Sequence, residues 1–168
     1  MIRVTGAGIV FEGADGTVVD FVSSFQDADL LVSELEDVLG VAPVPYPTSE
    51  PLYLYVESGT TAWNFGGLIV ADQGSGGYGG RAFKLIATVP SIGGVAIVTS
   101  GGFTIGDPIA DTTSFFGQAP HFYDNDYAGT GTQNSYSDGT YTMQNPKVSV
   151  VAEGRSTIIS LIIAPTGG

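Results

Sequence analysis

One stretch of the chain has the periodicity of an amphipathic helix, and it lies among segments that are typical of short strands and turns. Its apolar residues are Leu31, Leu35, Val38 and Leu39. A helix aligns residues at these spacings along one side. Asp27 is suited to cap the first turn, and Gly40 is suited to end the last one. We therefore predict a helix over residues 27–39 that buries this side against a sheet.

Strands are predicted on both sides of this helix. Residues 2–11 are predicted to be β-structure with a break at glycine, and the tripeptide Ala14-Asp15-Gly16 favours a tight turn before a strand over 17–21. Later strands are expected at 52–56, 61–71 with a kink or bulge at its Gly-Gly pair, 82–89, 94–99, 103–105, 148–152 and 157–163. A second, shorter helix is predicted over 108–116, with Asp107 as its N-cap and Pro108 at its first position.

Two stretches of the chain follow the same order of elements. Residues 14–43 and 101–120 both run from a turn through a strand and an acidic cap to a helix, a glycine and Ala-Pro. This similarity predicts an α+β fold of one domain, residues 1–168, built from two tandem units of about 1–93 and 94–168. Both helices would lie on one face of a largely antiparallel sheet. Chance recurrence of a common motif is the alternative.

The charge balance limits the classes of partner. The chain has 5 Lys and Arg against 17 Asp and Glu, and its formal net charge is -12. Nucleic acids and anionic membrane surfaces attract basic residues, so both are poor partners. Basic proteins, cations and neutral ligands stay open. The sequence has no cysteine, which excludes disulfides and thiol chemistry.

The location is inferred from composition. No run approaches the roughly 18 apolar residues of a membrane-spanning helix. Met1 is not followed by the pattern of a signal peptide, so the chain is either cytoplasmic or a mature exported domain. A composition rich in Gly, Thr, Ser and Tyr and poor in Lys favours export. We therefore expect an extracellular or cell-surface location and no membrane insertion by this segment.

Three segments carry a resemblance to a known group of proteins. They are "GFTIGDP", "TAWNFGGLIVAD" and "STIISLIIAPTGG". With these segments the chain resembles an uncharacterised domain of actinobacterial secreted proteins and lipoproteins. The resemblance implies an extracellular or membrane-tethered location and no known activity. The tandem plan is also similar to that of the β-lactamase inhibitor protein, in architecture only.

Residues that would support catalysis are few. His121 is the only histidine, and no G-x-S-x-G motif holds a nucleophile beside it. "GSGGYGG" at 74–80 lacks the Lys and the following helix of a phosphate-binding loop, and a strand follows it instead. A carbohydrate-active or other hydrolase using Asp124 and Asp126 is kept as an alternative function.

The same acidic loop is a candidate for a calcium site. Asp124, Asp126 and Asp138 offer the oxygen ligands that Ca²⁺ prefers. An EF-hand starting at Asp124 would need Glu at its twelfth position, where the chain has Ser135. A solvated acidic loop is the favoured interpretation, and no other cofactor is expected.

Aromatic residues give the clearest binding signal. Tyr123, Tyr127 and Tyr136 lie among small polar residues, as in adaptable recognition surfaces. His121 and Trp63 complete the set of candidate binding residues, with packing as the alternative role. We predict a non-enzymatic exported domain that binds a protein or cell-envelope partner. A structural envelope protein is the third alternative.

Overall fold

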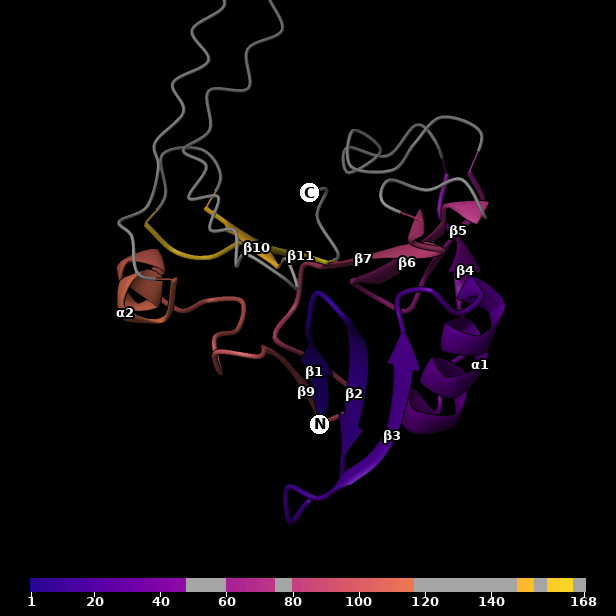
Figure 1. The fold of residues 1–168 in the computed structure, drawn as a ribbon, viewed down its shortest axis with the longest axis horizontal. Helices are drawn as coiled ribbons and strands as arrows, with labels where there is room; N and C mark the ends of the chain where they lie inside the picture. The colour runs from indigo at the N-terminus through magenta and orange to yellow at the C-terminus, as the bar shows by residue number, and fades with distance from the viewer. Residues whose placement is uncertain (48–59, 75–79, 117–147, 153–156, 165–168) are drawn as a thin grey trace, which may run out of the picture.

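The described residues form two sheets, two α-helices and a 3-10 turn (Figure 1). The computed structural model describes residues 1–47, 60–74, 80–116, 148–152 and 157–164. Most strand pairs in both sheets are antiparallel, and the helices are few and short. The predicted α+β class is therefore confirmed, although two sheets stand where one was expected.

The first sheet combines the N-terminus with a segment from the middle of the chain. Its strands are β1 (Ile2–Val4), β2 (Gly8–Glu12), β3 (Val18–Ser23), β8 (Ser91–Ile92) and β9 (Val95–Thr99). Their order is β3-β2-β1-β9-β8, so β3 and β8 are the outer strands. β1 and β9 run parallel, whereas the other pairs in this sheet are antiparallel.

The second sheet contains the most apolar segments of the chain. Its strands are β4 (Val44–Pro45), β5 (Ala62–Asn64), β6 (Leu68–Asp72), β7 (Phe83–Ala87), β10 (Ser149–Val151) and β11 (Leu161–Ala164). Their order is β10-β11-β7-β6-β5-β4. The single kinked strand predicted over 61–71 is wrong, because the chain reverses there into the β5–β6 hairpin. Asn64 Oδ1 accepts hydrogen bonds from the backbone N–H groups of Gly66 and Gly67 and holds the turn.

The main core lies where the two sheets and α1 (Ala28–Leu39) meet. The first sheet contributes alternate residues, since Ile2 and Val4 of β1 and Ile9 and Phe11 of β2 are buried, while Arg3 and Val10 between them are only partly buried. Strands β6 and β11 differ, because all their residues from Leu68 to Ala71 and from Leu161 to Ala164 are buried. The other face of the second sheet accordingly carries a smaller apolar cluster of its own. Continuous apolar runs are typical of strands buried on both faces.

Helix α1 confirms the predicted segment with two differences. Its buried residues include Leu31, Leu35 and Leu39, as the spacing indicated, but Val38 is 37% exposed. Asp27 holds the N-cap position without a capping hydrogen bond from its side chain. Gly40 ends the helix in the left-handed conformation, and its N–H donates to the carbonyl of Glu36. No helix among the described residues is long and apolar enough to cross a membrane.

The described part of the second half differs from the first half at the positions where the repeat predicts matching elements. The predicted helix over 108–116 divides into a 3-10 turn at Ile109–Thr112 and the single-turn helix α2 (Thr113–Phe116). Pro108 holds the N-cap position that was assigned to Asp107. Residues 103–105, the expected counterpart of β3, form no strand. Helices α1 and α2 lie at opposite ends of the molecule (Figure 1). The tandem repeat is therefore not confirmed.

Replacing Leu35 with Ala should destabilise the protein by about 2–5 kcal/mol, because it leaves a cavity where a fully buried side chain fills the core. Val38→Ala removes an exposed side chain from the same helix and should cost less than about 1 kcal/mol. Chemical denaturation of both variants measures the two free energies of unfolding. Equal losses would show that α1 does not pack as described.

Candidate functional site

Most of the predicted site residues lie outside the part of the chain that the structure describes. These residues are His121, Tyr123, Asp124, Asp126, Tyr127, Tyr136 and Asp138, and their roles stay predictions. Trp63 is described. It lies on β5, is half-buried and packs against the main core. The candidate site described below is therefore built from other residues.

The first sheet carries a group of exposed apolar side chains on and just after its outer strand. Val18 is 64% exposed, Val19 72%, Phe21 44% and Phe25 62%. We call these four residues the β3 surface. Several large apolar side chains exposed within one short segment are a reason to consider that segment as a binding surface. Single exposed apolar residues are ordinary, so what matters here is their grouping on one element.

These side chains are exposed because β3 reaches the core at only one position. Val22 is buried and lies opposite Ile9 of β2, whose side chain is also in the core. Towards its other end, β3 shifts register against β2 between Phe11 and Glu12. A shift of this kind bends a strand and turns its side chains away from their earlier direction. The β2–β3 hairpin therefore extends beyond the sheet, as Figure 1 shows.

The ring of Phe21 lies over a glycine. Gly8 has a backbone φ of 154°. A Cβ atom at this position would come within 2.1 Å of the carbonyl oxygen of Val22 and 3.0 Å of the Phe21 ring. Glycine therefore allows β3 to approach β2 closely, and the aromatic ring covers the space that a side chain would fill.

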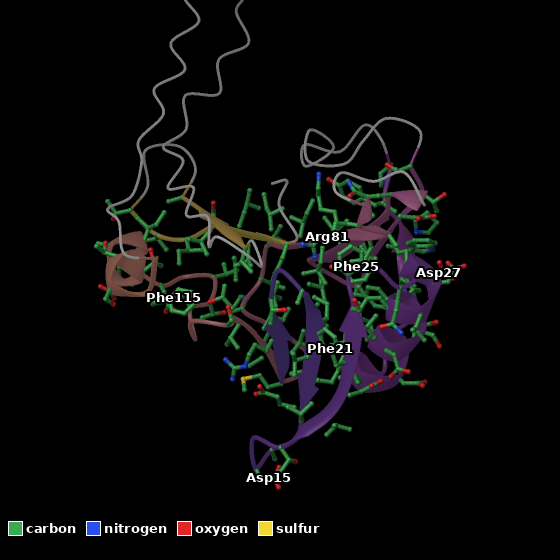
Figure 2. All side chains as sticks on the ribbon, viewed as in Figure 1. Asp15, Phe21, Phe25, Asp27, Arg81 and Phe115 are labelled. Carbon is green, nitrogen blue, oxygen red and sulfur yellow. The ribbon has the colours of Figure 1, made fainter. Side chains whose placement is uncertain are left out.

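Phe25 is held in place although most of its surface is exposed. The guanidinium of Arg81 lies 4.7 Å from the centre of its ring, within the range of a cation–π interaction. Arg81 donates hydrogen bonds to the carbonyl of Gly6, at 2.5 Å, and to the hydroxyl of Ser24. The N–H of Ala82 donates to the carbonyl of Ser24 at 2.8 Å. Figure 2 shows Phe25 and Arg81 together above Phe21, near the start of α1.

An acidic hollow adjoins Phe25. It has a volume of about 390 Å³ and is lined by Phe25, the start of α1 and the residues flanking the 75–79 segment. Asp27, Asp29 and Asp72 contribute three carboxylates to its wall. Among the described residues no set of three acidic or histidine side chains is arranged to hold a metal ion. The negative charge here suits the basic side chains of a partner.

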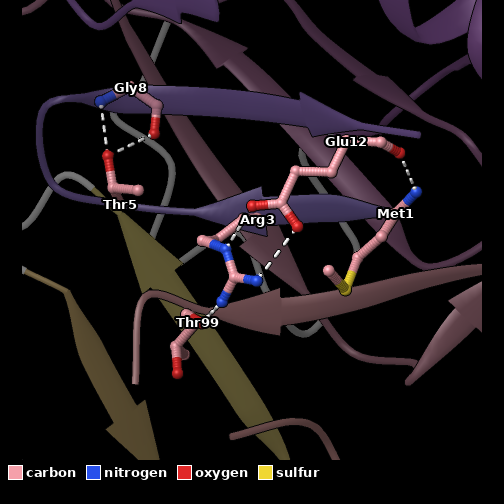
Figure 3. Close-up of polar contacts among 6 residues, drawn as sticks. All are labelled: Met1, Arg3, Thr5, Gly8, Glu12 and Thr99. Atoms are coloured by element: carbon pink, nitrogen blue, oxygen red, sulfur yellow. Dashed lines mark hydrogen bonds and ion pairs between the residues drawn. The ribbon is translucent and has the colours of Figure 1, made fainter. Parts of the chain in front are cut away.

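An ion pair orders the outer face of the same sheet. Arg3 of β1 donates to both carboxylate oxygens of Glu12 on β2, at 2.6 and 3.0 Å (Figure 3). A third donor of Arg3 reaches the carbonyl of Thr99 on β9 at 3.3 Å. The hydrogen bond from Arg3 lowers the pKa of Glu12. Arg3 thereby joins three strands on the face opposite the core.

Sequence reasoning missed Phe21 and Phe25. The segment "VVDFVSSF" at 18–25 contains both, but its local pattern predicts only a strand followed by a helix cap. A signal was present, because Val18 and Val19 are adjacent and cannot both face the core of a regular strand. The exposure of the aromatic rings depends on the position of β3 at the edge of the sheet, which the local pattern does not contain.

Gly8→Ala should destabilise the protein by at least about 2 kcal/mol, because the new methyl group collides with the backbone of Val22. Gly16→Ala is the matched control. Gly16 also has a positive φ, of 81°, but nothing lies within 4 Å of its added Cβ. Its cost should be confined to the backbone strain of about 1–2 kcal/mol. Thermal and urea unfolding compare the two, and a smaller loss for Gly8→Ala would contradict the close approach of β2 and β3.

The ion pair of Glu12 predicts a pH-dependent contribution to stability. A lowered pKa in the folded state stabilises the fold above the ordinary value of 4.5, and this contribution disappears as the pH falls through the folded pKa. Glu12→Gln should therefore be less stable than the natural chain near pH 7, and the difference should shrink below about pH 4. Urea unfolding between pH 3 and pH 7 measures it. A difference independent of pH would rule out a charge effect.

Comparisons with known proteins do not place the chain in a family. No family model matches it, and no curated protein or solved structure is significantly similar to it. The resemblance to a domain of actinobacterial secreted proteins gains no support from these comparisons. The functional argument therefore rests on the site itself.

Proposed function

We propose that this chain is a non-enzymatic, exported or cell-surface domain that binds a partner protein through the β3 surface. The observation that carries the proposal is the state of Phe25. Phe25 is 62% exposed and yet its ring is held by Arg81, so little side-chain freedom is lost when a partner covers it. Ordered aromatic residues that stand exposed are typical centres of binding energy.

The partner is expected to have an apolar pocket bordered by basic residues. Phe21 and Phe25 supply apolar area, and Asp27 and Asp29 lie on the α1 side of Phe25. Charges of opposite sign around an apolar centre speed the encounter and exclude wrong partners. The formal net charge of -12 also favours a partner that carries basic residues. The exported location in this proposal is supported by composition alone.

The test compares three baits: the natural chain, the double variant Phe21→Ser/Phe25→Ser and the control Val44→Ser. Val44 is 59% exposed but lies on β4, in the other sheet. Envelope and culture-medium fractions of the source organism are passed over each bait. A protein retained by the natural chain and the control should be lost at least about tenfold from the double variant. Salt should elute it, since its rim contacts are ionic.

Two measurements keep this result specific. The double variant should stay folded and lose no more than about 2 kcal/mol, because neither ring belongs to the buried core and only the contacts of Phe21 with Gly8 and of Phe25 with Arg81 are removed. Thermal unfolding measures this loss. The captured protein, once identified and purified, should bind the natural chain in isothermal titration. Equal retention by the natural chain and the folded double variant would refute binding through the β3 surface.

A further inference from the structure

The backbone of β3 has an outward edge that no other described strand covers. β3 is an outer strand of the first sheet, and the N–H groups along an antiparallel pair point alternately toward and away from the neighbour. Ser24 N–H donates to the carbonyl of Ala7 at 2.8 Å and so points toward the β2 side of the strand. The β2–β3 pairing continues from there without a shift as far as Asp20, which lies opposite Phe11. The alternation therefore places the N–H groups of Phe21 and Ser23 on the outward edge.

These two N–H groups already donate hydrogen bonds to side chains of the same segment. Phe21 N–H donates to Asp20 Oδ1 at 2.7 Å, and Ser23 N–H donates to Gln26 Oε1 at 2.6 Å. The N–H of Gln26 in turn donates to the carbonyl of Ser23 at 2.9 Å. Gln26 thus bonds both polar groups of the Ser23 backbone. A strand added at this edge would have to break these bonds before forming its own.

The need for such closure follows from the sequence of the strand. Val18, Val19, Phe21 and Val22 are all apolar and favour β-structure, and Asp20 is the one charged residue among them. Short segments of this composition at an exposed edge are prone to pair with copies of themselves. A single charge within such a segment is a common way to prevent this pairing.

We propose that Asp20 and Gln26 close the β3 edge to strand addition by a second copy of this chain, so that the β3 surface binds through its side chains. The statement on binding rests on the proposed function, whereas the closure of the edge does not. A second copy is the partner most suited to this edge, because a two-fold axis would pair β3 with an identical strand in antiparallel register. Asp20 also opposes that pairing, since it brings two carboxylates together.

The test uses two double variants of the full chain. Asp20→Ala/Gln26→Ala removes both acceptor side chains. Asp20→Asn/Gln26→Glu keeps an acceptor oxygen at each position and leaves the formal net charge at -12. Both residues are exposed, so each variant should keep its fold. Sedimentation equilibrium over a range of concentrations measures self-association. The alanine variant should associate about tenfold more tightly than the natural chain. The control keeps both acceptor oxygens but lacks the charge of Asp20, so its association should lie between those of the natural chain and the alanine variant.

Amide hydrogen exchange provides a readout that does not depend on association. At low concentration, exchange at Phe21 and Ser23 should be faster in the alanine variant than in the natural chain, while exchange in β1 stays unchanged. Unchanged exchange at both amides would show that the side chains do not protect them and would overturn the proposal. Equal self-association of the alanine variant and the natural chain, or of the two double variants, would overturn it as well. None of these outcomes bears on the loss of partner binding in Phe21→Ser/Phe25→Ser.

Discussion

The parallel pairing of β1 with β9 joins segments that are far apart in the chain and places the rest of the first sheet. Ile2 lies opposite Ile97, and both side chains are fully buried in the main core. On the other face, Arg3 donates to the carbonyl of Thr99 across 96 positions of sequence. Closing so long a loop costs chain entropy, and burial of apolar residues between the sheets offsets that cost. Because β9 takes one edge of β1 and β2 takes the other, β3 becomes an outer strand.

That outer position explains why β3 combines two opposite properties. Its side chains are apolar and largely exposed, whereas part of its backbone edge is closed by Asp20 and Gln26. Exposed apolar side chains favour contact with a partner, and an open edge would favour pairing with any available strand. Under the two proposals made above, this separation would let the β3 surface bind through shape and charge while the sheet edge stays closed to indiscriminate pairing. Phe25, held by Arg81, adds an ordered aromatic ring to the same surface.

Local patterns predicted those features whose cause is local. The spacing of Leu31 and Leu35 located α1, because a helix of any origin aligns residues four apart. Asp15 located the β2–β3 turn, where its carboxylate accepts hydrogen bonds from the backbone and hydroxyl of Thr17. The strand predicted over 61–71 failed, since a Gly-Gly pair is compatible with a bulge and with a reversal. The reversal is stabilised by Asn64, whose Oδ1 accepts hydrogen bonds from the backbone N–H groups of Gly66 and Gly67 in the turn.

The sequence by itself determined the α+β class, the position of the main helix, the position of most strands and the acidic character of the surface. These properties follow from composition and from the periodicity of neighbouring residues. Only the tertiary structure decided that the strands divide into two sheets and that Phe21 and Phe25 are exposed. A strand carries the same pattern whether it lies at the centre or at the edge of a sheet. Which edge stays uncovered depends on contacts such as that between Ile2 and Ile97, which are distant in sequence and selected by packing of the whole core.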